Sequence, residues 1–199
     1  MITVEGPEGS GKSTQVRNIV SWLKKKGFRL RLLREPGGTP LGEEIRKILL
    51  TSRGEGMGTH AELFLFLAAR AQLVEKMILP ALQRGEVVLC DRFFDSTVVY
   101  QGIAGKLGHD FVERLCTWGA LGVRPDVTFF LDVHYKEGLK RSGRKDRMEQ
   151  KSFAFHRDVA EGYRKVAKRH AGRAIVIDGR QSIETVRAKI EGELEKVLG

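Results

Sequence analysis

A glycine-rich segment near the start of the chain constrains the fold more than any other feature. Residues 6–13 read GPEGSGKS and fit the pattern G-x-x-x-x-G-K-[ST]. They follow a short apolar run at residues 2–4, and apolar residues at helical spacing come after them from residue 16 to residue 23. In such a strand-loop-helix unit, glycines allow backbone N–H groups to surround phosphate oxygens, and the helix dipole adds to the attraction. The complete motif in this place disfavours the alternative of a glycine-rich turn that binds nothing.

The motif predicts a nucleoside triphosphate as ligand and assigns roles within the loop. Lys12 is expected to reach the β- and γ-phosphates, and the Ser13 hydroxyl is expected to bind Mg²⁺. ATP or GTP would be held by the loop as a whole, which comprises Gly6, Pro7, Glu8, Gly9, Ser10, Gly11, Lys12, Ser13 and Thr14. The sequence has no N-K-x-D stretch with which a GTPase reads its base, so small-molecule phosphoryl transfer is the favoured reaction class.

Length and composition indicate a single domain that spans residues 1–199. Of the 199 residues, 41% are hydrophobic and 30% are charged, as in ordinary globular proteins. The sequence shows neither the roughly 20-residue apolar run of a membrane helix nor a signal-peptide pattern, so we expect a cytoplasmic protein with no membrane partner. The net charge of +10 fits nucleic acid, a polyanionic small substrate or a solvated surface. Because lysines and arginines are spread along the chain, nucleic acid is not expected as a partner.

Segments with strand and helix patterns alternate along the chain. Strands are expected at 2–4, 28–33, 87–91, 126–133 and 173–178. Helices are expected from 13 to the stop at Gly27, then at 41–50, 61–84 with Pro80 bending or interrupting it, 93–101, 110–120, 136–142, 149–170 and 183–197. This alternation predicts an α/β fold with a parallel sheet covered by helices on both faces.

The predicted sheet brings distant parts of the sequence together at one edge. Parallel sheets bind ligands beyond the carboxyl ends of their strands. The glycine loop, residues 34–35, residues 91–92 and Asp178 all lie at such strand ends. We therefore expect one site at this edge. Cys90, in a buried strand, and Cys116, on a helix, are expected to be core thiols.

Three further stretches are similar to the thymidylate kinase family: LREPGGTPLGEEIR at 33–46, AELFLFLAARAQLVE at 61–75 and DRFFDSTVVYQG at 91–102. Together with the glycine loop and DRMEQ at 146–150, they occur in the order found in bacterial-type members of that family. The resemblance implies a P-loop kinase fold with five parallel strands and a mobile lid at about 136–150. It also implies transfer of the γ-phosphoryl group of ATP to dTMP, which gives dTDP and ADP with the help of Mg²⁺ in dTTP synthesis.

The resemblance assigns a base pocket for the acceptor nucleotide. Phe66 would stack on thymine, and Arg70, four residues further along the same helical face, would reach the carbonyl edge of the base. Phe66 as an ordinary core residue remains the alternative. Tyr100 would lie against the sugar, where a ribose 2′-hydroxyl would clash, or it would be a packing residue. The remaining residues that match the base pocket are Ser96, Thr97 and Gln101.

The resemblance also places residues around the phosphates. Arg92 would bind the phosphates between the two nucleotides, with Asp91 near the metal, although an ordinary ion pair is the alternative. Arg46 would contact the acceptor phosphate unless it lies on a solvated helix face, and Arg34 would shape or line the site. Glu8 would accept a hydrogen bond from the sugar 3′-hydroxyl and face away from the ATP phosphates.

A basic segment, KEGLKRSGRKDR at 136–147, matches the lid of the family. A solvated charge run is the usual explanation of such a segment. The glycine loop holds no arginine, so the family branch in which the lid supplies a catalytic arginine matches better. Asp146 and Glu149 would hold Arg147 in place. Backbone groups near Arg180 would contact the adenine. The candidate lid arginines are Arg141, which could instead stack on adenine, Arg144 and Arg147.

A homodimer is expected by resemblance, through the apolar helices around 61–83 and 93–120. Two other functions remain open at this point. One is a kinase for a different nucleoside monophosphate. The other is a basic P-loop protein that acts on nucleic acid or as a switch, for which the acceptor-pocket residues would not be needed.

Overall fold

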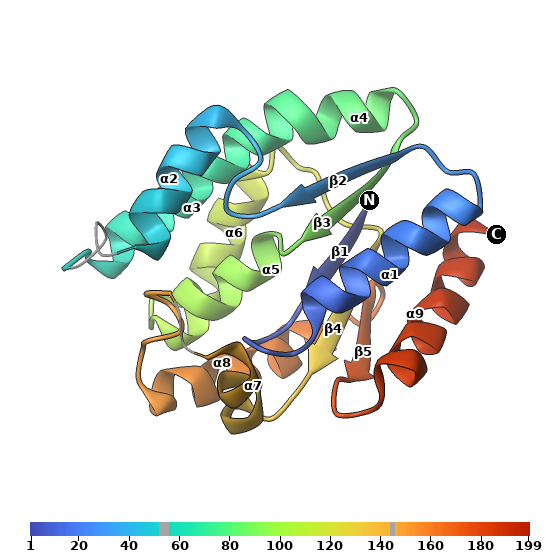
Figure 1. The fold of residues 1–199 in the computed structure, drawn as a ribbon. Coiled ribbons are helices and arrows are strands. Elements are labelled where there is room, and N and C mark those ends of the chain that lie inside the picture. The colour runs from blue at the N-terminus through green and yellow to red at the C-terminus, as the bar shows by residue number, and fades with distance from the viewer. Residues whose placement is uncertain (52–55, 144–145) are drawn as a thin grey trace.

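Five parallel strands form the central sheet, in the order β2-β3-β1-β4-β5 (Figure 1). The computed structural model describes residues 1–51, 56–143 and 146–199. The register aligns Ile2 of β1 with Leu89 of β3 on one side and Val127 of β4 on the other. The predicted five-stranded parallel sheet is thus confirmed. Its strands are β1 (Ile2–Glu5), β2 (Leu30–Arg34), β3 (Val87–Asp91), β4 (Val127–Asp132) and β5 (Ala174–Asp178).

Helices connect the strands and cover both faces of the sheet (Figure 1). Two helical segments, η2 and η3, have the wider π-helical turn, which often occurs at functional sites. No helix in the described part of the chain combines the length and the apolar character that a membrane crossing requires. The helical segments are α1 (Lys12–Lys25), α2 (Pro40–Leu50), α3 (Thr59–Leu73), η2 (Val74–Ile78), α4 (Leu79–Gln83), α5 (Phe94–Thr97), η3 (Val98–Ala104), α6 (His109–Gly119), α7 (Tyr135–Ser142), α8 (Phe153–Arg169) and α9 (Ile183–Leu198).

The sheet separates two hydrophobic cores. On one face, Leu89 and its neighbours from β1 and β4 pack against α1 and α9. On the other face, Val88 and Cys90 pack with α3, η2, η3, α6 and α8. Successive residues of a strand point to opposite faces, which explains why β3 contributes alternately to each core. Cys90 and Cys116 are buried free thiols, as expected.

The strand ends bring the predicted site residues to one edge of the sheet. β1 is the central strand and leads directly into the glycine loop, while β3 beside it ends at Asp91. β2 ends at Arg34 and β5 at Asp178. β2 and β3 lie on one side of β1, whereas β4 and β5 lie on its other side. The glycine loop therefore lies at the point where the direction of strand addition reverses.

Some expected boundaries differ from the structure. The helix expected at 61–84 begins at residue 59, and its α-helical pattern changes to the π-helical turn of η2 before Pro80 rather than at it. Pro80 lies in the first turn of α4, where its ring is tolerated. The helix expected at 149–170 begins only at Phe153, after an N-cap by Ser152, whose side chain accepts a hydrogen bond from the Phe155 N–H.

Candidate active site

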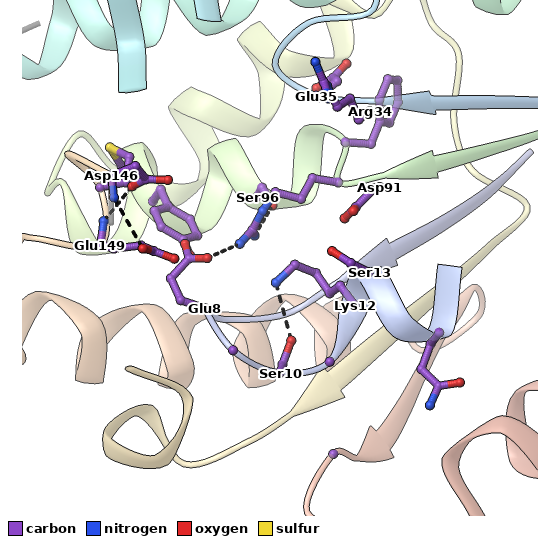
Figure 2. A pocket seen from close by; sticks show the side chains of 18 of the residues that line it. Glu8, Ser10, Lys12, Ser13, Arg34, Glu35, Asp91, Ser96, Asp146 and Glu149 are labelled. Atoms are coloured by element: carbon purple, nitrogen blue, oxygen red, sulfur yellow. Dashed lines mark hydrogen bonds and ion pairs between the residues drawn. The ribbon is translucent and has the colours of Figure 1, made fainter. Parts of the chain in front are cut away.

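A cavity of about 780 Å³ opens at the carboxyl edge of the sheet. Its lining includes loop residues from Glu8 to Gln15, the ends of β2 and β3, and residues of α3, α5 and η3. The cavity also reaches Arg141 of α7 and the turn at residues 179–183 before and at the start of α9. Figure 2 shows side chains from these separate elements facing one shared space. The topology therefore assembles one site from segments that lie far apart in the sequence.

The glycine loop is held in a conformation that side chains would prevent. A Cβ at Gly9 would lie 2.0 Å from the carbonyl oxygen of Gly138 in α7, and Gly9 has a φ of 63°. Gly11 is the N-cap of α1 in the left-handed region, with a φ of 91°. The loop therefore packs its backbone directly against α7.

Lys12 is buried, and its ammonium group lies inside the loop. Its Nζ donates to the Gly6 carbonyl at 3.0 Å, to the Pro7 carbonyl at 2.8 Å and to Ser10 Oγ at 3.4 Å (Figure 2). Burial and the nearby Arg92 together lower the pKa of Lys12 to about 8, against the opposing effect of Glu8. The Lys12 ammonium group, which donates to loop oxygens, can exchange these acceptors for phosphate oxygens.

Arg92 connects the phosphate loop to the acceptor side of the cavity. Its guanidinium donates to the Gly6 carbonyl at 3.0 Å, to Glu8 Oε2 at 2.8 Å and to Tyr163 Oη at 2.7 Å. Its backbone has a φ of 68°, an uncommon value for a residue with a side chain and one that often marks functional sites. Tyr100 also donates to Glu8, at 2.5 Å. Glu8 therefore faces Arg92 and Tyr100.

The charge of Glu8 is set by these neighbours. Burial alone would raise its pKa, but the Arg92 and Lys12 cations and the Tyr100 hydroxyl outweigh burial and lower the pKa to about 2. Glu8 is consequently a carboxylate at any physiological pH. It can accept a hydrogen bond from a hydroxyl group and also anchor Arg92.

Glu5, the last residue of β1, is a functional candidate that sequence analysis missed. It is fully buried, and its carboxylate accepts hydrogen bonds from the Phe93 N–H at 2.7 Å and from Ser96 Oγ at 2.6 Å. Burial and the nearby Asp95 raise the pKa of Glu5 to about 7. Glu5 thus fixes the turn that carries Arg92. The signal in the sequence was an ionisable residue at the end of the central buried strand.

Arg70 is buried and already has a protein partner. It donates to both carboxylate oxygens of Glu35, with Nε–Oε1 at 3.2 Å and Nη2–Oε2 at 2.5 Å, and to Thr97 Oγ1 at 2.9 Å. We expected a base carbonyl to satisfy this arginine, whereas the structure satisfies it with Glu35, at the end of β2. Arg70 also lines the cavity, together with Phe66, Thr97 and Gln101.

The other predicted acceptor residues also lie at the cavity. Its lining includes Arg34, Arg46, Ser96 and Tyr100. Arg46 donates to the Pro36 carbonyl at 2.8 Å, and the exposed Arg34 forms an ion pair with Glu43. Arg34 of β2 and Arg46 of α2 therefore line the border of the cavity, and neither is fully buried.

The basic segment distributes its arginines differently from the expectation. Arg141 lines the cavity, donates to the Gly179 carbonyl at 3.3 Å and pairs with Glu137. Arg147, by contrast, donates to the Leu49 carbonyl at 2.7 Å and to Glu62 at 2.5 Å, and it is absent from the described residues that line the cavity. Arg144 lies outside the described residues.

One further expectation about side chains is corrected by the structure. Asp146 and Glu149 were expected to hold Arg147, but each accepts a hydrogen bond from the other's backbone N–H (Figure 2). Arg147 pairs instead with Glu62, 85 residues away in the sequence, a partner that the local pattern could not reveal. Near Arg180, whose backbone surroundings were expected to meet the adenine, Gly179 and Gln181 line the cavity, while the Arg180 side chain pairs with Asp178.

Ser13 and Asp91 provide oxygen atoms at the loop end of the cavity. Both line the cavity, and Figure 2 shows them beside Lys12. A hydroxyl and a carboxylate next to a phosphate-binding loop are the donor types that Mg²⁺ prefers. This donor set fits a magnesium ion bound together with phosphate oxygens.

The loop geometry, the parallel sheet and the cationic cavity define a P-loop nucleotide-binding protein, in which the cavity extends from the phosphate loop to Phe66 and Arg70. Comparison with known proteins gives the family. Residues 4–190 match the family model described as thymidylate kinase, and the chain belongs to the thymidylate kinase family.

Individual relatives cover nearly the whole chain. The thymidylate kinase of Exiguobacterium sp. is 42% identical over 192 residues, which span 95% of this chain and 91% of the relative. That of Chlamydia muridarum is 48% identical over 182 residues, 89% of each chain. A crystal structure of thymidylate kinase from Ehrlichia chaffeensis superimposes with a TM-score of 0.81 at 31% identity and covers 97% of both chains. The P-loop kinase fold is thereby confirmed.

Proposed function

We propose that this protein transfers the γ-phosphoryl group of ATP to dTMP, giving dTDP and ADP, as a step of dTTP synthesis in the cytoplasm. The observation that carries the proposal is the continuity of the cavity. A phosphate loop and a pocket with Phe66, Arg70 and Gln101 line one space, and Arg92 lies between them with contacts to the loop and to Ser96. Two nucleotides can therefore meet there phosphate to phosphate. Membership of the thymidylate kinase family supports the choice of dTMP.

The proposed reaction needs cations more than it needs a base. A phosphate monoester has a second pKa of about 6 and is largely a dianion at neutral pH. One of its oxygens forms a bond to the γ-phosphorus while the bond from that phosphorus to the bridging oxygen of ADP breaks. The main barrier is the approach of two anionic groups, which Lys12, Arg92 and Arg141 reduce by neutralising charge.

Mg²⁺ would be held by Ser13 and Asp91 together with phosphate oxygens. When bound, the ion supplies further neutralisation of the β- and γ-phosphates. The loop residues from Gly6 to Thr14 other than Pro7, which has no backbone N–H, would hold the ATP phosphates through their backbone N–H groups. The segment around 136–150 serves as a lid that excludes water, with Arg141, and in the proposal also Arg144, as its cations. Because Arg147 is paired with Glu62, it is the weakest of the three candidate lid arginines.

The contacts of Tyr100 and Glu8 support selection of a deoxynucleotide. Tyr100 is buried, and its hydroxyl is tied to Glu8, which in turn is tied to Arg92. A ring fixed in this way cannot move aside for an additional hydroxyl group. Glu8 keeps acceptor capacity for the 3′-hydroxyl, while exclusion by Tyr100 disfavours a 2′-hydroxyl.

An assay of acceptor specificity tests the proposed function. The protein is incubated with ATP, Mg²⁺ and each of dTMP, dUMP, UMP, dCMP, dAMP and dGMP, and formation of the diphosphates is measured. We expect the highest kcat/KM with dTMP and a rate with UMP at least about tenfold below that with dUMP, the size of a modest steric discrimination. A higher kcat/KM with any other base would contradict the assignment of dTMP. Equal rates with UMP and dUMP would contradict only the sugar selection.

A homodimer through α3 and α6 is also proposed. These helices pack together, since a Cβ at Gly119 of α6 would lie 3.4 Å from Leu67 of α3. Their outer surfaces leave Phe64 60% exposed and Trp118 78% exposed, with Leu121 also exposed. Large aromatic side chains gathered on two adjacent helices are typical of a protein interface.

A further inference from the structure

Glu62 is a buried carboxylate that receives hydrogen bonds from three side chains in two separate parts of the chain. It lies in the first turn of α3 and is only 2% exposed. Gln101 Nε2 of η3 donates to its Oε1 at 2.7 Å, and Arg147 Nη2 donates to its Oε2 at 2.5 Å. Lys151 Nζ lies 3.3 Å from Oε1. A buried carboxylate normally has such a set of donors, but here one of the donors also lines the active-site cavity.

The contact with Glu62 determines which way the Gln101 amide points. A carboxylate only accepts hydrogen bonds, so the amide must turn its NH₂ group toward Glu62. Its carbonyl oxygen, Oε1, then has no hydrogen-bond partner among residues 1–51, 56–143 and 146–199, although Gln101 is completely buried. Buried acceptors are rarely left without a donor in a folded protein. Because Gln101 lines the cavity, the missing donor is expected from a ligand.

Arg147 and Lys151 keep Glu62 in the form that this arrangement needs. A protonated carboxyl group could donate to the Gln101 carbonyl oxygen and permit the opposite amide orientation. Two cations within hydrogen-bond or ion-pair distance favour the ionised form, as does the position of Glu62 in the first turn of a helix. The carboxylate, the two cations and the amide therefore act as one unit.

We propose that Glu62 is a positioning residue for base selection: it holds the Gln101 amide with its carbonyl oxygen toward the acceptor base and so selects a base that presents an N–H group at that place. This inference rests on the proposed function, and it deepens that function. Thymine and uracil carry a hydrogen on N3, whereas N3 of cytosine has a lone pair that would face the carbonyl oxygen. A buried site that lacks its complementary donor is strongly disfavoured.

Substitution Glu62→Gln tests the inference while preserving the size of the side chain. The glutamine oxygen is expected to remain with Arg147 and Lys151, so its NH₂ group faces Gln101 and forces that amide to turn over. We expect KM for dTMP to rise and the ratio of kcat/KM for dTMP to that for dCMP to fall at least about tenfold, as for one lost buried hydrogen bond. KM for ATP should change by less than about twofold, because ATP binds at the other end of the cavity. Glu44→Gln, on the exposed surface of α2, is the matched control.

A double substitution separates positioning from a general structural role. If Glu62 acts through Gln101, then Glu62→Gln should have no further effect on the dTMP to dCMP ratio in a Gln101→Leu background. If Glu62 only stabilises the fold, the single variant should unfold more easily but retain the wild-type ratio and KM. An unchanged ratio in the folded single variant, or an additive effect in the double variant, would overturn the inference.

A structure of the wild-type protein with dTMP gives a test that does not depend on the folding of any variant. The Gln101 amide should remain bonded to Glu62, with Oε1 within hydrogen-bond distance of N3. Release of Glu62 by Gln101, or a base that contacts another group through N3, would overturn the inference. If the wild-type protein phosphorylates another monophosphate instead of dTMP, the proposed function fails and this inference fails with it. If the wild-type protein phosphorylates dTMP but Glu62→Gln leaves the ratio of kcat/KM for dTMP to that for dCMP unchanged, only this inference is contradicted.

Discussion

At the scale of single residues, the site consists of charged groups whose partners determine what each can do. Arg92 has bonds to the Gly6 carbonyl, Glu8 and Tyr163, so its guanidinium is held in place before any ligand arrives. Such preorganisation is valuable for phosphoryl transfer because no free energy is spent on ordering the cation during the reaction. The left-handed backbone at Arg92 is a further sign that the fold maintains this position at a cost.

Substitution Arg92→Met tests the importance of this cation. We expect kcat with ATP and dTMP to fall by about 10²–10³-fold, the usual effect of removing one transition-state donor. Circular dichroism and a urea titration would show whether the variant is folded. Arg187→Met, which removes an exposed arginine paired with Glu191 on α9, should leave kcat unchanged. Near-normal turnover by a folded Arg92→Met variant would remove Arg92 from the catalytic residues.

The sequence allowed the residues of the motifs to be named but not their partners. Lys12, Ser13, Arg92 and Gln101 could be proposed because motif and resemblance single them out. Arg147 was proposed as a lid cation, but the structure pairs it with Glu62, which is 85 residues away. Distant pairs of this kind depend on how the elements pack together, and a single sequence carries no direct signal of them.

At the scale of elements, β1 and β3 form the rigid part of the site. They pair in parallel, with Val4 opposite Asp91, and Glu5 at the end of β1 accepts the Phe93 N–H that follows β3. Their short buried apolar runs were enough to predict these strands. The π-helical turn of η3 could not be predicted, since its residues also fit an ordinary α-helix, and yet it carries Tyr100 and Gln101.

The buried Glu5 carboxyl gives the junction of β1 and β3 a pH dependence. Its pKa is about 7 in the folded protein, raised from 4.5 by burial and by Asp95. An acid whose pKa is raised on folding loses its stabilising contribution as the pH rises toward the folded value. We therefore expect it to lower the free energy of unfolding by up to about 3 kcal/mol between pH 4.5 and pH 7.

Urea titrations at several pH values between 4.5 and 8 would measure this effect. Glu5→Gln should remove most of the slope in that range, and Glu44→Gln should not. Glu8 does not interfere, because its pKa is lowered to about 2, so its stabilising contribution is complete above pH 4.5 and is lost only as the pH falls toward 2. The same slope in wild type and Glu5→Gln would refute this account of Glu5.

At the scale of the whole molecule, Phe64 of α3, Trp118 of α6 and Leu121, which follows α6, are among the large apolar side chains that the described part of the chain leaves exposed. We expect the protein to be a dimer by light scattering, and Trp118→Glu to convert it to a monomer because a buried charge at an interface is costly. Val197→Glu, at an exposed apolar position near the end of α9, should remain dimeric. A wild-type monomer would contradict the proposed interface.

The pairing of Arg70 with Glu35 has a consequence for how a ligand enters the cavity. The pair carries no net charge, so this region exerts little pull on an anion. Lys12 inside the glycine loop and Arg141 beside Gly179 make the loop end of the cavity attractive to one. A molecule with a phosphate at one end and an uncharged ring at the other is therefore turned by the electric field during its approach. It arrives already aligned, before any contact specific to its shape has formed.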